Sequence, residues 1–176
     1  MASELTVQTI QGPASGANAN KILIPSGQKI IAEAGGLVAP GQVIQVVQGV
    51  FQSYTTTTST SAVATGLTAS ITPKFSTSKI LINVFGSNQQ VTSGTTNIYP
   101  LYKNGSVLDS TFMIWSAPTP DGVAMSASYF DNPATTSALT YALYFRTENG
   151  GYTASFGSNT AAGSYRNSIT LMEIAQ

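Results

Sequence analysis

The 176-residue chain contains no histidine and no cysteine, and charged residues make up only 8% of it. Without histidine there is no Ser-His-Asp triad and no imidazole general base. Without cysteine there is no thiolate nucleophile and no disulfide. Zinc and haem sites also lose their usual ligands. We therefore expect no catalytic residues, no metal site and no cofactor, and we predict that the protein is not an enzyme.

An excess of charge of one sign is also missing, because seven Lys and Arg residues balance seven Asp and Glu residues. The charges are scattered singly, so no basic stripe is present that could neutralise phosphates, and we expect no nucleic-acid partner. No apolar run approaches the ~18 residues of a membrane-spanning helix, and the first five residues lack the pattern of a secretory signal. We therefore expect no membrane insertion and synthesis in a cytoplasm.

The rest of the sequence consists of β-forming residues, Ser and Thr, and turn residues. No helical periodicity is sustained, and turn signals recur at the short intervals typical of an antiparallel sandwich or barrel. The sequence therefore predicts an all-β fold. The predicted strands are residues 42–52, 61–72, 78–86, 96–103, 106–115, 122–130, 138–147, 151–156 and 167–174.

Two short segments carry more specific signals. Asn104-Gly105, which lies between two runs of β-forming residues, predicts a hairpin with a type I′ turn. The Ser/Thr run 53–61 allows two interpretations. It is an exposed strand or polar interface seam, since Thr favours a pleated, half-exposed surface, or it is a flexible loop.

The pattern of apolar residues differs between strands. Residues 140–146 predict a half-buried strand, because apolar side chains alternate along them. Segments 43–51 and 80–85 are apolar on both faces, and such strands need cover on both sides. A neighbouring subunit would provide this cover, and the alternative is that the N-terminal segment folds back over the strands. The candidate residues for contacts between subunits are Val43, Val47, Phe51, Leu81 and Phe85.

The chain divides near Pro40-Gly41 into an extended N-terminal arm, residues 1–41, and a head, residues 42–176. Within the arm, the segment 24–27 predicts a turn with proline at its second position and glycine at its fourth. Residues 21–24 and 28–31 are then expected to pair as a small hairpin. The arm holds too many small residues to form its own core, so it needs the head or other copies of itself as a partner.

Paired carboxylates are the enzymatic option that the composition leaves. A glycosidase needs two of them facing each other across a substrate cleft. Several of the candidates are explained more simply as turn residues whose side chains bond to nearby backbone. The candidates in the head are Asp109, Asp121, Asp131, Glu148 and Glu173.

Two polar loops, near residues 88–97 and 115–122, are the predicted recognition surfaces. Trp115 could present a flat ring to a sugar or a protein, or it could end a core strand and pack inward. The first loop could hydrogen-bond to a glycan or could be a solvated connection. The candidate residues for receptor contact are Asn88, Gln89, Gln90, Trp115 and Asp121.

Several segments together resemble a known family. They are PGQVIQVVQ (40–48), TGLTASITPK (65–74), SKILINV (78–84) and ITLMEIA (169–175). The series resembles the C-terminal β module of tail-fibre-like virion proteins of tailed bacteriophages, notably those of cyanobacteria. The segment ILIPSG (22–27) is similar to the short β repeats of fibre shafts.

The resemblance implies a homotrimeric fibre or knob with a jelly-roll-like β-sandwich head, whose arm attaches to other virion proteins or intertwines. It carries over no catalytic residue. We therefore expect a short tail fibre or fibre tip, made in the host cytoplasm, that binds a glycan or protein on the host surface. Two alternatives stay open: a capsid decoration or head-fibre protein anchored by its arm, and a depolymerase of surface glycans.

Overall fold

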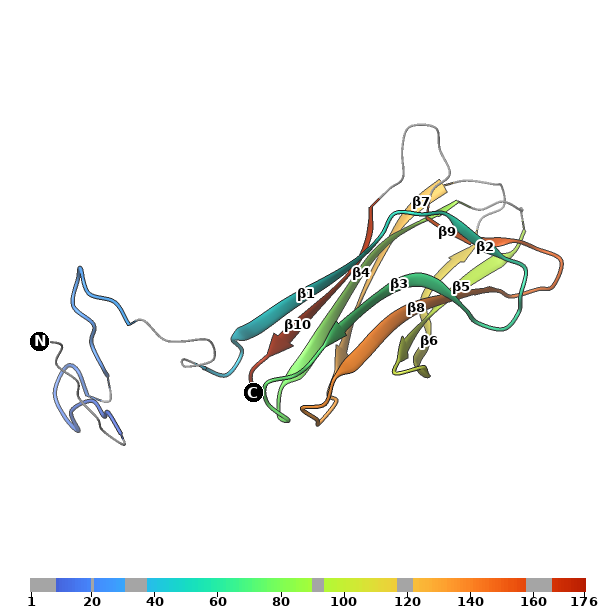
Figure 1. Cartoon of the computed structure of the whole chain (residues 1–176). Coiled ribbons are helices and arrows are strands. Elements are labelled where there is room, and N and C mark those ends of the chain that lie inside the picture. The colour runs from blue at the N-terminus through green and yellow to red at the C-terminus, as the bar shows by residue number, and fades with distance from the viewer. Residues whose placement is uncertain (1–8, 20, 31–37, 90–93, 117–121, 158–165) are drawn as a thin grey trace, which may run out of the picture. The chain divides into compact units, whose positions relative to one another are not determined.

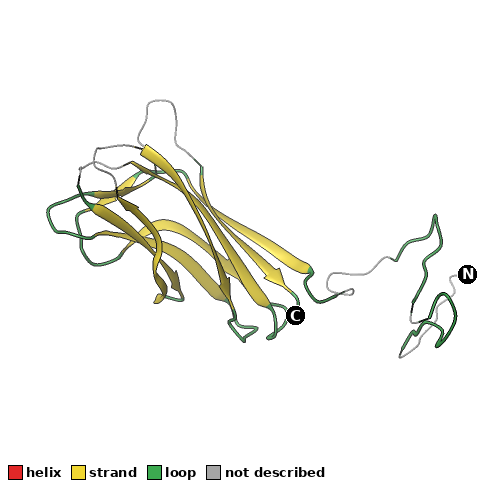
Figure 2. Cartoon of the chain, turned by 180° about the vertical axis from the view of Figure 1, so that it is seen from behind, coloured by secondary structure: helices red, strands yellow, loops and turns green. Residues whose placement is uncertain are grey.

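The structure is a computed structural model that describes residues 9–19, 21–30, 38–89, 94–116, 122–157 and 166–176. Within these residues every regular element is a β-strand (Figure 2), which confirms the predicted all-β class. The described residues include no helix that is long and apolar enough to cross a bilayer. The chain divides into two units, Met1–Leu37 and Val38–Gln176.

The described residues of the second unit form ten strands, and most of the strand bounds lie within two residues of the predicted ones. The strands are β1 (Val43–Phe51), β2 (Thr55–Thr57), β3 (Val63–Ile71), β4 (Lys79–Gln89), β5 (Thr96–Lys103), β6 (Ser106–Ser116), β7 (Gly122–Asp131), β8 (Leu139–Thr147), β9 (Ala154–Phe156) and β10 (Asn167–Ile174).

The strands form two four-stranded antiparallel sheets and one short ribbon (Figure 1). The first sheet, here called the β1 sheet, has the order β1-β10-β4-β7. The second, called the β3 sheet, has the order β3-β8-β5-β6, and β2 pairs with β9 in the ribbon. One core lies between the two sheets, so the predicted β-sandwich is confirmed.

The sandwich core follows from strict alternation along its strands. In β8, Tyr141, Leu143 and Phe145 are buried while the residues between them are half-buried, as the sequence predicts. In β10, Ile169 and Leu171 are buried in the same way. Because inward side chains of both sheets meet in one layer, the fold is held mainly by apolar burial.

The two sheets come into direct backbone contact where β1 passes over β3. A Cβ atom at Gly49 would overlap the backbone carbonyl of Thr68, so no larger residue fits at this position. The predicted hairpin between β5 and β6 is confirmed as a type I′ turn, since Asn104 (φ 49°) and Gly105 (φ 78°) both have positive φ. Asn104 Oδ1 also accepts a hydrogen bond of 2.8 Å from the Thr140 amide.

The Ser/Thr run is partly a strand: Thr55–Thr57 forms β2 and pairs with Ala154–Phe156 of β9. The predicted hairpin in the N-terminal segment is wrong. Residues 21–30 contain no strand, and the Gln28 amide donates to the Pro25 carbonyl (3.1 Å), one residue later than predicted. A lone two-stranded hairpin is marginal in water, and the described residues of the N-terminal unit contain no strand that could extend it into a sheet.

The connections between strands gather at two ends of the sandwich (Figure 1). At the end where β1 begins and β10 finishes, called the near end, Gly41 N donates to Ala175 O (2.8 Å) and Ala175 N donates to Gln42 O (2.9 Å). At the opposite end, called the distal end, β4, β6 and β8 finish and the β2–β9 ribbon lies.

Candidate functional site

The near end holds a polar cluster that joins the two sheets. Asp131, the last residue of β7, is 2.9 Å from Lys103 Nζ and accepts a 2.6 Å hydrogen bond from the Tyr141 hydroxyl. Lys103 and Tyr141 belong to the opposite sheet, so the carboxylate bridges the sandwich. Burial, together with the hydrogen bond to Asp131, raises the pKa of Tyr141, which therefore acts as a neutral donor.

A second buried carboxylate lies in the same row of the β1 sheet. Glu173 accepts hydrogen bonds from Gln45 Nε2 (2.6 Å) and from the backbone amides of Lys74 (2.8 Å) and Phe75 (3.2 Å). Burial alone would raise the pKa of Glu173, but these hydrogen bonds outweigh it and lower the pKa from its usual value. The side chain is therefore held as an anion.

These contacts decide what the acidic residues can do. The register places Glu173 and Asp131 on either side of Ile80, and both carboxylates are buried and bonded within the protein. Asp109 accepts from the Thr111 amide (2.9 Å), Glu148 is exposed, and Asp121 lies outside the described residues. The carboxylates of Asp109, Asp131 and Glu173 thus bond within the protein, and the described acidic residues form no group suited to holding a metal ion.

The distal end has a buried polar cluster of another kind. The Tyr99 hydroxyl donates to the Ser155 carbonyl (2.6 Å), and Ser155 Oγ donates to Asn88 Oδ1 (3.0 Å). Other polar atoms beside them are buried and make no hydrogen bond within the described chain. They are Asn88 Nδ2, Asn97 Oδ1, Asn97 Nδ2 and Trp115 Nε1.

The register brings these unpaired groups together. Asn97 of β5 lies directly opposite Trp115 of β6 and Thr147 of β8. Unpaired buried polar groups are costly, and each one in a native protein calls for an explanation such as an ordered water or a bound group. The distal end is therefore our candidate functional site.

Three of the five predicted receptor-contact residues, Asn88, Gln89 and Trp115, lie at this end. Asn88 is buried near the end of β4, and Gln89 is the last residue of that strand. Trp115 is half-buried and packs against the core. Gln90 and Asp121 lie outside the described residues. The structure thus places the starts of both predicted loops at one end of the sandwich.

Sequence reasoning missed Tyr99 and Ser155, and it included Asn97 only as the last residue of the predicted loop 88–97, without naming it as a contact residue. A usable signal was present, because Asn97 and Tyr99 have the same strand parity as the buried Leu101 and therefore point inward. Ser155 has no such signal, since β9 is only three residues long.

The outer face of the β1 sheet is the second candidate. Cross-strand pairing aligns Val46, Met172, Leu81 and Phe130 in one apolar row that runs through all four strands. Val46 is 56% exposed and Phe130 is 55% exposed. We call this row and its neighbours Val43, Val50 and Phe85 the outer apolar face.

The predicted subunit-contact residues divide between the two faces of the β1 sheet. Val43, Leu81 and Phe85 lie on the outer apolar face. Val47 and Phe51 point the other way and pack against the core of their own chain. Only the first three are therefore available to a neighbour.

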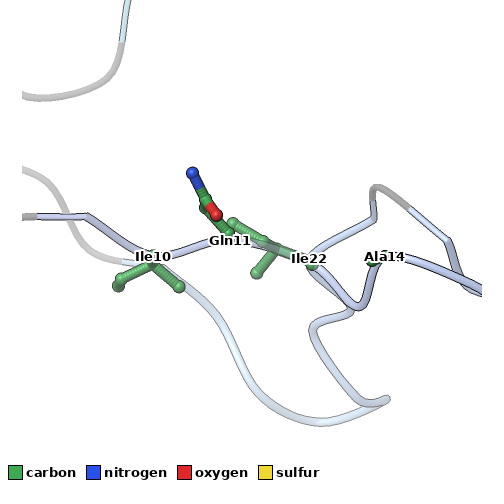
Figure 3. A pocket seen from close by; sticks show the side chains of 5 residues that line it. Ile10, Gln11, Ala14 and Ile22 are labelled. Atoms are coloured by element: carbon green, nitrogen blue, oxygen red, sulfur yellow. The ribbon is translucent and has the colours of Figure 1, made fainter.

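A shallow hollow lies in the N-terminal unit (Figure 3). No ionisable side chain lines it, so it offers no acid–base chemistry. Its lining residues are Ile10, Gln11, Gly12, Ala14 and Ile22.

No protein-family model matches the chain, and no curated protein matches it. Among solved structures, the chain is similar to dimeric latent PorU from Porphyromonas gingivalis, with a TM-score of 0.44 and 11% sequence identity. The match covers 89% of this chain and 15% of the PorU chain, so this chain spans a small part of that protein's length. A likeness at this level supports no argument about fold or function.

Proposed function

We propose that the chain is a bacteriophage virion structural protein, a short tail fibre or fibre tip that adheres to the host surface. The observation that carries this proposal is the polarity of the sandwich. The chain enters the head at the near end through residues 39–42, whereas both predicted contact loops start at the distal end. A head attached at one end and recognising a target at the other needs this arrangement.

The order of the strands supports a jelly-roll-like head. If the short strands β2 and β9 are left out, the eight other strands can be numbered 1 to 8 in chain order. One sheet then has the order 1-8-3-6 and the other has the order 2-7-4-5. This is the strand order of a jelly roll, an architecture found in viral capsid and lectin domains. Since one fold hosts many functions, the strand order supports the architecture and leaves the function to the site.

The proposed mechanism is multivalent adhesion by a homotrimer. Weak binding of each distal end to a host glycan or protein gains strength through effective concentration, because three heads are held together. Segment 1–41 would join the head to other virion proteins. The unpaired polar groups of Asn88 and Asn97 support a distal end that adapts its hydrogen bonds on binding.

Immunogold electron microscopy of virions of the phage that encodes the chain tests this location. Labelling at the tail tip is expected. Labelling over the shell would favour the decoration protein, and unlabelled particles with the protein left in the lysate would overturn the virion assignment. Release of reducing ends from host polysaccharide by the purified protein would favour the depolymerase.

A further inference from the structure

We propose that the outer apolar face of the β1 sheet binds further copies of this chain. The inference deepens the proposed function, because it names the surface through which heads would associate. The inference depends on the exposed side chains of that face, and it can be tested on the purified protein without a host cell.

The first argument is the concentration of exposed apolar side chains on one surface. Val46, Val50, Phe85 and Phe130 are each at least 40% exposed and lie on the same side of one sheet. Monomeric soluble proteins rarely expose apolar patches larger than a few hundred Å², and larger patches mark interaction sites. The centre of a protein interface is depleted of charge, and Lys79, at the margin, is the charged residue of the outer-facing rows.

The second argument is a polar row whose side chains bond to one another in pairs. Between the apolar rows lie Gln48, Thr170, Asn83 and Ser128, aligned across the four strands. Gln48 Nε2 donates to Thr170 Oγ1 (3.1 Å), and Ser128 Oγ donates to Asn83 Oδ1 (2.6 Å). Because these groups already bond to one another, covering the face loses few hydrogen bonds.

The third argument concerns size and the identity of the occupant. Four strands spaced about 4.8 Å apart, with about eight residues of about 3.4 Å each, give a projected face of roughly 500 Å². A surface covered with side chains exposes more area than its projection. The exposed area of this face therefore approaches the ~800 Å² that each partner buries in a standard interface. A sheet of this size is matched by a second sheet better than by a single extended segment.

The fourth argument is the free edge at which the apolar row ends. β7 pairs with β4 over all ten of its residues without a bulge, and its edge carries no lysine and no proline. Its one charged residue, Asp131, is buried on the inner side. Natural edge strands usually carry such protective features, so their absence here favours contact with another copy.

Light scattering after size exclusion measures the effect directly. The full-length protein should have a mass near three times 18.3 kDa in the trimer of the proposed function. Phe130→Asp, which places a charge in the row, should lower the mass about threefold, and Val46→Asp should do the same from the opposite edge. Ile114→Asp is the matched control, because Ile114 is 53% exposed on the outer side of the β3 sheet.

Thermal unfolding of each variant shows whether its head is folded. Because the substituted positions are exposed, the head should stay folded in every variant. A monomeric full-length protein would overturn the inference, as would an unchanged mass in both Asp variants. If Ile114→Asp also lowered the mass, the loss would not be specific to the β1 sheet, and the inference would be overturned. An oligomer that is absent from virions would uphold the interface while the proposed function fails, so the two failures are distinguishable.

Discussion

The two ends of the sandwich differ in how completely their buried polar groups are hydrogen-bonded. At the near end, Asp131 and Glu173 have hydrogen-bond partners on both carboxylate oxygens, and Ser78 Oγ is the one buried polar side-chain atom there that lacks a well-formed hydrogen bond within the described chain. At the distal end, Asn97 is equally buried beside Tyr99, yet its amide makes no well-formed hydrogen bond within the described chain. The distal end thus has more buried polar atoms that cost stability than the near end has.

In the proposed function, this difference separates stability at the near end from recognition at the distal end. Buried polar networks make a structure rigid when every member is satisfied, and they are a cost when only some are. Natural proteins tolerate such costs mainly at functional sites. The carboxylate of Asp131 holds the two sheets together at the near end, and the proposal assigns the unpaired groups of the distal end to target binding.

The largest effect is expected from breaking the near-end network. Asp131→Ala leaves the Lys103 ammonium and the Tyr141 hydroxyl without their partner, which should lower the free energy of unfolding by about 3 kcal/mol. This is the low end of the usual range, because Lys103 is 28% exposed and can reach water. Urea denaturation measures the loss. Glu148→Ala, at an exposed carboxylate, should change stability by less than about 0.5 kcal/mol.

A smaller, pH-dependent loss is expected at Glu173. Its pKa is lowered in the folded state, so its contribution is fully present above the ordinary value of 4.5 and is lost as the pH falls through the folded pKa. Glu173→Gln should cost about 1.5 kcal/mol at pH 7, since hydrogen bonds to a charged acceptor are weakened.

Chemical denaturation between pH 7 and pH 3 checks this sign. The difference between wild type and Glu173→Gln should be largest at pH 7 and should shrink below pH 4.5. A difference that is constant over this range would show that the charge of Glu173 has no part in its contacts.

The smallest effect should have the opposite sign and lies at the distal end. Asn97→Leu keeps the branching of the side chain and removes an unpaired amide, so stability should rise by about 1 kcal/mol. Asn167→Leu is the matched comparison. Asn167 is also fully buried, but it accepts from Ser87 N (2.8 Å) and donates to Phe51 O (3.2 Å), so this variant should lose about 2 kcal/mol.

Thermal and urea unfolding of the two variants give the comparison. A large loss in Asn97→Leu would mean that the amide is satisfied by an ordered water or bound group. The buried polar groups of the distal end would then be hydrogen-bonded as those of the near end are, and the difference between the two ends would disappear.

Much of the fold could be predicted because its strands are encoded by local patterns. The alternation along 140–146 and the Asn104-Gly105 turn specify their structure through neighbours in sequence alone. β4 shows the limit. Its predicted end was residue 86, because Ser87 and Asn88 have the composition of a loop, yet the strand continues to Gln89.

The reason for this extension lies far away in the sequence. Residues 86–89 of β4 pair with residues 122–125 of β7, so the strand continues on that partner. Asn167 Oδ1 also accepts from both the amide (2.8 Å) and the hydroxyl (3.0 Å) of Ser87, which ties this end of β4 to β10. The β2–β9 ribbon likewise depends on pairing between distant segments. The candidate site is built from such contacts, so sequence reasoning located its loops and missed Tyr99 and Ser155 inside it.

The pairing of the first strand with the last also sets an order of events during synthesis. Gln48 and Thr170 bond to each other across 122 residues, so β1 has no partner strand until β10 has been made. Folding dominated by such distant pairs is slow. Met172 completes the outer apolar face at the same step, so the proposed contact between copies requires that each chain has first made and paired its last strand.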